Sequence, residues 1–229
     1  GDSLLNLYET GKMSGLTEVL FIERCLNLLK PGGRMGIVLP EGVLNNTNLQ
    51  KIRDFVESKA KILLVVSIPQ DVFIASGATV KPSLLFFKKF TEEEAEQYKA
   101  IQIAAQSDAE QPYKNELAEI TAKLSKRGKE APSKEDKKLL QARQKEIQTT
   151  IENETKKLAK ERFGYQIPIA EVQKAGISTT GAPIENELEP LEQEFTAYRK
   201  ENKLWQPLIH RIRYVISDNG TLTRLRDTK

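Results

Sequence analysis

The chain has 229 residues, of which 39% are hydrophobic and 29% charged, and its formal net charge is +3. This length allows one ordinary domain or two small ones, and so small a net charge does not by itself indicate a nucleic-acid partner. A single cysteine, Cys25, excludes an intramolecular disulfide. We expect it to be a buried thiol on a helix, which fits a reducing, cytoplasmic compartment. No apolar run approaches transmembrane length, and no signal peptide is visible.

The chain contains few of the residues on which common catalytic and metal sites depend. His210 is the single histidine, so Ser-His-Asp or Cys-His chemistry would have to use it, and no Gly-x-Ser-x-Gly turn is present. We interpret His210 as a surface or interface residue. One histidine and one cysteine leave too few ligands for a zinc site. There is no Walker A loop, and Gly32-Gly33 precedes a strand pattern, which is the wrong order for phosphate binding.

Positions 21–90 alternate between helix and strand patterns and define the fold. The patterns predict helices at Val19–Leu29 and Asn48–Lys59, and apolar strands at Arg34–Leu39, Ile62–Ile68 and Pro82–Phe90. We expect Arg34–Leu39 to be buried, because helices feeding near-continuous apolar strands are typical of α/β folds with a mostly parallel sheet. The third strand follows the second without a helix between them, so it is predicted to run antiparallel to it.

Positions 91–163 differ in character, with Glu and Lys dominant. Two apolar seams with helical spacing run through this segment, one at Leu117, Ile120 and Leu124 and one at Leu140, Ile147, Ile151 and Leu158. Between the seams, Gly128 and Pro132 indicate a break, and Ser133 is a candidate N-cap with Asp136 three residues later. The pattern predicts two antiparallel helices, a coiled-coil hairpin that projects from the sheet.

Positions 164–229 are predicted to form an edge strand followed by helices. Tyr165–Val172 alternates like a strand, and the proline within it indicates an edge position. Pro190–Asn202 is predicted to be helical, and Leu204–Val215 is interpreted as a second helix, apolar and basic. Asp218-Asn219-Gly220 predicts a turn, and we expect Thr221–Lys229 to be disordered or cut from a longer chain. Three parts are therefore expected, at positions 1–90, 91–163 and 164–229.

Three stretches of the sequence, in order, resemble one family. They are FIERCLNLLKPGGRMGIVLPEGVLNN, KIRDFVESKAKILLVVSIPQDVF and SLLFFKK. They resemble the modification subunits of type I restriction systems, which are S-adenosylmethionine-dependent DNA adenine-N6 methyltransferases. The resemblance is close over Leu16–Phe90 and looser over Tyr165–Lys200, through AEVQKAGISTTG and the helix after it. It matches Leu29–Gly33 to the turn before the family's fifth strand and Ile37–Leu44 to that strand and its loop. It matches Val65–Phe73 to the sixth strand and its loop, and Ser83–Lys88 to the antiparallel last strand.

The resemblance implies the C-terminal half of a Rossmann-like methyltransferase sheet, with an inserted helical hairpin and a helical tail. The family binds S-adenosylmethionine through an acidic Gly-rich motif on the first strand and acts through an Asn-Pro-Pro-Phe/Tyr motif after the fourth. Neither motif occurs in this chain, and both would lie before Gly1. We therefore expect no catalytic and no cofactor-binding residue here, and no activity from this chain alone.

The resemblance also indicates where a flipped adenine or its DNA would contact this chain. The candidate contacts are Phe73, Lys81, Asn45 and Asn46. In related enzymes an aromatic residue after the sixth strand stacks on the base, and Phe73 matches it; alternatively, Phe73 fills the core beside Val72 and Phe86. Lys81 is a candidate phosphate contact or simply a solvated lysine. The two asparagines either line the same cleft or serve as loop and helix-start residues.

Two main interpretations of the function remain open. In the first, the chain is part of a DNA adenine-N6 methyltransferase, with DNA, a DNA-specificity subunit and possibly a restriction subunit as partners. In the second, it is a non-enzymatic methyltransferase-like scaffold that docks a partner subunit through its hairpin. Another S-adenosylmethionine enzyme on the same sheet is also open. An isolated half-sheet would expose an edge and an apolar face, so we expect self-pairing or an ordered remnant of a longer protein.

Overall fold

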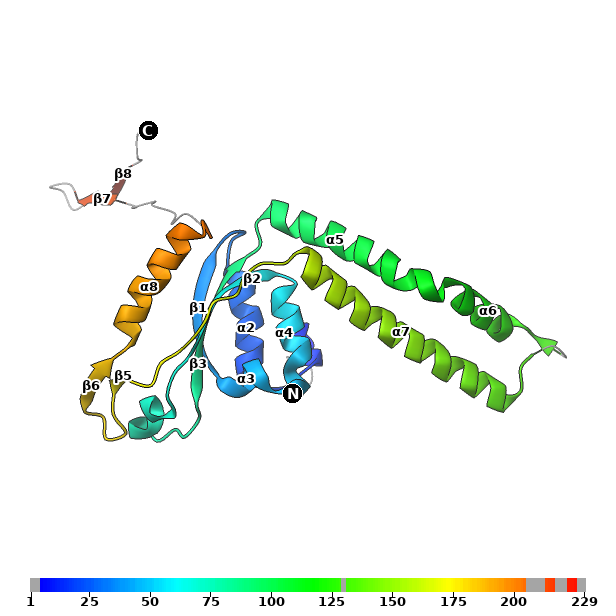
Figure 1. Ribbon diagram of the computed structural model, residues 1–229, viewed down its shortest axis with the longest axis horizontal. Helices are drawn as coiled ribbons and strands as arrows, with labels where there is room; N and C mark the ends of the chain where they lie inside the picture. The colour runs from blue at the N-terminus through cyan, green and yellow to red at the C-terminus, as the bar shows by residue number, and fades with distance from the viewer. Residues whose placement is uncertain (1–4, 129–130, 205–212, 217–221, 226–229) are drawn as a thin grey trace.

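In the computed structural model, helices cover both faces of a small sheet, and a long helical arm projects from one side (Figure 1). The structure describes residues 5–128, 131–204, 213–216 and 222–225. Among these residues, no helix is both long enough and apolar enough to span a membrane. The predicted α/β fold class is confirmed.

The helices and strands of positions 21–90 are all present, with ends shifted by a few residues. The helices are α2 Thr17–Leu28, α3 Glu41–Asn45, α4 Gln50–Glu57, α5 Glu92–Glu110, α6 Lys114–Ser125, α7 Lys134–Arg162 and α8 Leu188–Glu201. Short 3-10 helices are η1 Thr10–Lys12, η2 Thr47–Leu49, η3 Gln70–Ser76 and η4 Gln111–Tyr113. The strands are β1 Arg34–Pro40, β2 Ala60–Ser67, β3 Pro82–Lys89, β4 Ile169–Glu171, β5 Ala175–Ile177, β6 Pro183–Asn186, β7 Arg213–Ile216 and β8 Leu222–Leu225.

The main sheet has four strands in the order β1-β3-β2-β4. Strand β3 lies between β1 and β2 and is antiparallel to both, as predicted for its pairing with β2. Strand β4 pairs in parallel with β2. The expectation of a mostly parallel sheet is wrong for the described residues. The helical crossover makes β1 and β2 point the same way, and the loop after β2 returns the chain into the gap between them.

Strand β1 lies at an edge of this sheet and is only partly buried. Leu39 is 1% exposed, but Val38 is 52% exposed. The prediction that Arg34–Leu39 is a buried strand is therefore wrong. Because β1 pairs with β3 on one side, its other edge has no strand beside it among the described residues.

The main core lies between the sheet and helices α2 and α4 (Figure 1). The buried side chains of this face are Val19, Ile22 and Leu26 from α2, and Ile52, Phe55 and Val56 from α4. Phe87 of the central strand β3 is fully buried in the same cluster. Each such side chain contributes about 1.5–3 kcal/mol by leaving water. Cys25 lies on α2 as predicted but is only half-buried.

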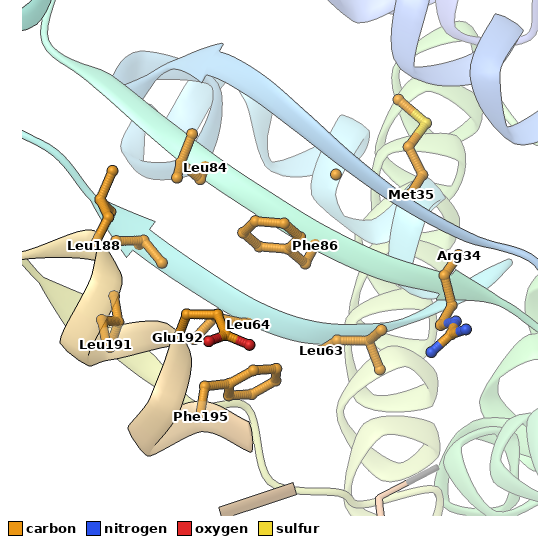
Figure 2. Close-up of a pocket in the computed structure, with 12 residues that line it drawn as sticks. Arg34, Met35, Leu63, Leu64, Leu84, Phe86, Leu188, Leu191, Glu192 and Phe195 are labelled. Carbon is orange, nitrogen blue, oxygen red and sulfur yellow. The ribbon is translucent and has the colours of Figure 1, made fainter. Parts of the chain in front are cut away.

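The opposite face of the sheet packs against α8. The buried cluster here is Leu64, Val66, Ile68 and Val172, with Leu188, Leu191 and Phe195 of α8 partly buried against it. A cavity of about 440 Å³ remains between sheet and helix (Figure 2). No residue of α8 is fully buried, so the helix covers this face loosely.

The arm is a helical hairpin in which α5 and α6 pack against α7, so two helices stand where one was predicted for its first half. Pro112 lies in η4, the turn that separates α5 from α6. The buried seam consists of Ala109, Ile120, Ile147 and Ile151, with Leu117, Leu124, Leu140 and Leu158 packed around it. Both predicted seams are thus confirmed. Ser133 Oγ accepts a hydrogen bond from the Asp136 amide at 3.1 Å, which confirms the predicted N-cap.

Glu94 fastens the arm to the sheet. It lies in the first turn of α5, where Thr91 and Glu94 form a capping box. Its carboxylate also pairs with Lys61 of β2 at 3.0 Å and with Lys88 of β3 at 2.8 Å. Burial by itself raises the pKa of Glu94, but hydrogen bonds from Lys88, the Thr91 amide and Lys61 outweigh it and lower the pKa to about 2.

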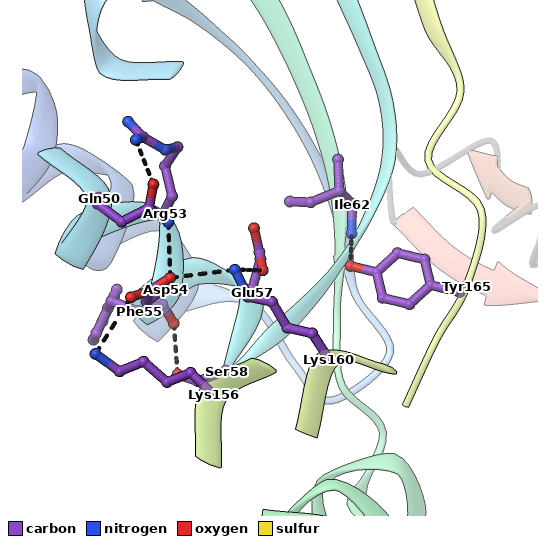
Figure 3. A network of polar contacts seen from close by, with 10 residues as sticks. All are labelled: Gln50, Arg53, Asp54, Phe55, Glu57, Ser58, Ile62, Lys156, Lys160 and Tyr165. Atoms are coloured by element: carbon purple, nitrogen blue, oxygen red, sulfur yellow. Dashed lines mark hydrogen bonds and ion pairs between the residues drawn. The ribbon is translucent and has the colours of Figure 1, made fainter. Parts of the chain in front are cut away.

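Aromatic rings close the same junction. The Phe163 ring at the end of α7 lies edge-on to Phe90 and Tyr98, with centroid distances of 5.2 and 5.1 Å. Tyr165 Oη accepts a hydrogen bond from the Ile62 amide at 3.0 Å (Figure 3). The pairing of β2 with β3 shifts register directly after Ile62, so this hydroxyl satisfies an amide beside an irregularity in the sheet.

A set of ion pairs joins α7 to α4 on the other side of the junction (Figure 3). Lys160 Nζ lies 2.7 Å from Glu57 and 3.3 Å from Asp54, and Lys156 Nζ lies 3.5 Å from Asp54. Each exposed pair contributes little alone. Together with Glu94 they hold the base of the arm against both a helix and the sheet.

The C-terminal part agrees with the prediction only partly. Within Tyr165–Val172, residues Ile169–Glu171 form the predicted edge strand, and α8 is the predicted helix. Positions 213–216 and 222–225 form an antiparallel pair of strands, so the helix expected up to Val215 and the disorder expected at 222–225 are wrong there. The β-branched residues of these segments favour strands. Positions 205–212 of the expected second helix, including His210, lie outside the described residues, as do the turn at 218–220 and positions 221 and 226–229.

Replacing Glu94 with Gln is expected to lower the free energy of unfolding at pH 7 by about 1–3 kcal/mol, since a helix cap and charge-assisted hydrogen bonds are weakened. The pKa of Glu94 falls from 4.5 to about 2 on folding. Its contribution is therefore complete above about pH 4.5 and is lost as the pH falls toward 2. Urea denaturation across this range should show the gap between wild type and Glu94→Gln closing.

The matched control is Glu96→Gln, an exposed position on the same helix. It should change the free energy of unfolding by less than about 0.5 kcal/mol. Equal effects of the two substitutions would show that Glu94 does not fasten the arm.

Candidate functional site

The carboxyl ends of β1, β2 and β4 meet the start of β3 at one end of the sheet. Pro40 of β1 lies opposite Pro82 of β3, and Ser67 of β2 lies opposite both Ser83 and Glu171. Loops at this end of an α/β sheet usually carry ligand chemistry. The sheet thereby gathers the residues that precede and follow these strands.

Lys81 is held at this end by two carboxylates. Its Nζ lies 3.3 Å from Glu41 Oε1 and 3.6 Å from Glu171 Oε1, and the Glu41 amide donates a hydrogen bond to the Lys81 carbonyl at 2.9 Å. The hydrogen bond to Glu41 raises the pKa of Lys81, with help from the charge of Glu171. Lys81 is thus paired with two carboxylates, and a phosphate would have to compete with both.

A groove of about 380 Å³ opens beside this ion pair, between α3, α4 and strand β4. Apolar side chains such as Val65, Leu85 and Ile169 form most of its lining, and Glu41 and Asn45 lie at its border. The groove can therefore hold an apolar group with a few polar contacts.

Ser67 places a further polar atom in the lining of this groove. Its Oγ is buried and has no hydrogen-bond partner among the described residues. A water or a polar group of a ligand in the groove would satisfy this hydroxyl.

The two candidate asparagines have different surroundings. Asn45 is exposed and lines the groove. Asn46 Oδ1 accepts a hydrogen bond from the Asn48 amide at 2.9 Å and caps η2. The Asn46 carbonyl accepts a hydrogen bond from Arg53 Nη1 at 2.7 Å. Asn46 is therefore engaged in starting the helical segment that continues into α4.

Phe73 lies in η3, in the loop after β2, and is half-buried. It belongs to none of the three core clusters of the described residues, whereas Val72 and Phe86 pack against the second. The loop is closed by a hydrogen bond from the Ala78 amide to the Phe73 carbonyl at 3.0 Å and by one from Gln70 Nε2 to the Thr79 carbonyl. Phe73 does not line the groove beside Lys81.

Two charged residues of this site were missed from the sequence. Glu41 directly follows the first strand, and this place at the carboxyl end of the strand was a local signal. Glu171 had none, because its approach to Lys81 depends on the pairing of β4 with β2. Among the described residues, no group of three or more His, Cys, Asp or Glu side chains can hold a metal ion.

A family model places the chain among known proteins. The model of the N-6 DNA methylases matches residues 9–181. This chain belongs to the N-6 DNA methylase family. The match includes the four-stranded sheet and the whole arm, and it ends before α8.

Similar individual proteins match this N-6 DNA methylase family member only in part. Defense against restriction protein B of Escherichia phage P1 is 29% identical over 76 residues, which are 33% of this chain and 3% of that protein. A class I S-adenosylmethionine-dependent methyltransferase structure from Listeria monocytogenes is 24% identical, with a TM-score of 0.35, over 40% of this chain and 28% of its own. The M protein of the type I restriction enzyme EcoKI is 27% identical, with a TM-score of 0.31, over 35% of this chain and 16% of its own.

Asn46 and Asn45 are expected to differ in their contribution to the free energy of unfolding. Asn46→Ala removes a cap and is expected to lower the free energy of unfolding by about 1 kcal/mol. Asn45→Ala should change it by less than about 0.5 kcal/mol, because the side chain is exposed. Urea denaturation of both variants checks this, and an equal loss in both would contradict the assigned cap.

Proposed function

We propose that this chain is part of a DNA adenine-N6 methyltransferase of a restriction-modification system. Such an enzyme transfers a methyl group from S-adenosylmethionine to the exocyclic amine of an adenine flipped out of the duplex. The observation that carries the proposal is the match of the N-6 DNA methylase model to residues 9–181. Because the chain spans only 3% to 40% of the length of the relatives and structures it matches, the activity is proposed for the full-length protein.

The residues of this chain do not fit S-adenosylmethionine. The sequence has no acidic Gly-rich turn after a strand and no Asn-Pro-Pro motif. Glu41, the carboxylate at the end of β1, is already paired with Lys81. The groove beside it is mainly apolar. We therefore assign no step of methyl transfer to residues of this chain.

The chain's own contribution is a wall of the site for the base and its DNA. Phe73 offers an aromatic ring in the loop after β2, and stacking on a base is worth about 1–3 kcal/mol. Lys81 and Asn45 lie at the same end of the sheet, where Lys81 would exchange a carboxylate for a phosphate. Asn46 contributes indirectly by capping the helical segment behind Asn45.

The partners of the full-length protein are proposed from the same family assignment. They are duplex DNA, a DNA-specificity subunit and a restriction subunit, in the cytoplasm. The structural units are proposed to be residues 1–90 for the sheet part, 91–163 for the arm and 164–229 for the edge strand and tail.

A scaffold that docks a partner through the arm is the second candidate function. Ile103 and Leu139 favour it, because these large apolar side chains are 63% and 68% exposed on the arm and a docked partner would remove them from water. The two candidates differ in one observable. A scaffold transfers no methyl group under any condition.

The experiment is methyl transfer from tritium-labelled S-adenosylmethionine to duplex DNA by the full-length protein together with its co-expressed subunits. Label in adenine supports the enzyme. Absence of label from DNA, with partner subunits still retained on the purified protein, supports the scaffold instead.

Phe73→Ala in the full-length protein is expected to lower the turnover number about 10- to 100-fold, since loss of stacking costs about 1–3 kcal/mol. The control is Ile74→Ala, the neighbouring exposed residue, which should leave turnover unchanged. The labelled-methyl assay measures both. Turnover of Phe73→Ala equal to that of Ile74→Ala would remove the stacking role.

A further inference from the structure

Charge is distributed unevenly along the arm. Positions 120–139, here called the arm tip, contain seven Lys or Arg and three Asp or Glu residues. The arm middle, positions 102–119 and 140–153, contains three Lys or Arg and six Asp or Glu residues. The end of the arm is thus cationic, while the segments just behind it are anionic.

Ion pairs hold some of the cations in the base and middle of the arm, whereas five cations of the tip have none with a described residue. Arg143 pairs with Glu116 and Glu146 in the middle, and Arg162 pairs with Asp108 nearer the base. At the tip, no carboxylate of a described residue pairs with Lys123, Arg127, Lys134, Lys137 or Lys138, and all five are exposed. The tip therefore presents cations that are available to an external anion.

The tip is also placed to reach beyond the sheet. Helix α7 has 29 residues, which corresponds to a length of about 44 Å at 1.5 Å per residue. Figure 1 shows the tip at the end of the arm farthest from the sheet. The Asp136 carboxylate accepts a hydrogen bond from Ser133 Oγ at 2.7 Å, so one of the few anions at the tip is occupied within the chain.

We propose that the arm tip binds the phosphate backbone of duplex DNA at a distance from the base being modified. Duplex DNA carries one negative charge per about 1.7 Å of its axis, so several flexible lysines can each find a phosphate. Such contacts position a protein without reading sequence. The proposal rests on the proposed function for its choice of DNA as the partner, but it concerns a surface remote from the strand ends.

The test compares two charge-matched variants of the full-length protein. The tip variant carries Arg127→Gln, Lys134→Gln, Lys137→Gln and Lys138→Gln. The control variant carries Lys99→Gln, Lys114→Gln, Lys145→Gln and Lys157→Gln, which are exposed cations of the base and middle of the arm. Glutamine preserves helix propensity at the helical sites, which are all of these except Arg127. Both variants lose the same formal charge, so a general effect of net charge on DNA binding affects them equally.

The measurement is the dissociation constant for a 40-base-pair duplex of mixed sequence at several salt concentrations. In the tip variant, we expect binding weakened about tenfold or more at 0.1 M salt, and a slope of log K against log salt smaller by about 3 to 4. The control variant should keep the wild-type slope. Equal slopes in the two variants would overturn the proposal, and so would loss of a partner subunit from the tip variant with DNA binding intact.

The methyl-transfer assay separates this inference from the proposed function. If methyl transfer is observed but the tip variant binds DNA like wild type, the inference about the tip is contradicted and the proposed function stands. If the salt slope depends on the tip but no methyl transfer occurs under any condition, the proposed enzymatic function is contradicted and the DNA-binding role of the tip stands.

Discussion

A single partly buried carboxylate, that of Glu94, joins the two halves of this structure. It caps the first helix of the arm while pairing with one lysine on β2 and one on β3. Because these strands are the two central strands of the sheet, the arm is attached to the middle of the fold. The ring cluster around Phe163 and the ion pairs from α7 to α4 then fix its direction. An arm attached in this way projects its tip to a defined place relative to the strand ends.

The strand order has a second consequence, for the site. Because β3 inserts between β1 and β2, its first residues lie between the carboxyl ends of the other strands. Lys81 is thereby held between Glu41 and Glu171, which come from positions 130 residues apart in the sequence. The groove with Ser67 and Asn45 opens beside the same residues. The groove and the ion pair beside it thus result from topology rather than from any contiguous motif.

Features that depend on local pattern could be predicted from the sequence. The seam of the arm, its Ser133 cap and the antiparallel direction of β3 each follow from spacing within a few turns or from the length of one loop. The exposure of β1 could not be predicted, because an apolar run looks the same at an edge as at the centre. Neither could the Glu171 contact or the bond from Ile62 to Tyr165, which join segments about one hundred residues apart. The candidate residues Phe73 and Asn46 came from the resemblance, and the structure distinguishes them from Asn45 by their neighbours.

Within this member of the N-6 DNA methylase family, we propose that the sheet end contacts a flipped base and that the arm contacts its DNA. The most direct measurement is the modified-base content of DNA from cells that express the full-length protein with its partner subunits, determined by mass spectrometry after digestion to nucleosides. N6-methyladenine above the level in cells without the gene is the predicted result. No increase in any methylated base, or methylation of cytosine in its place, would contradict the account.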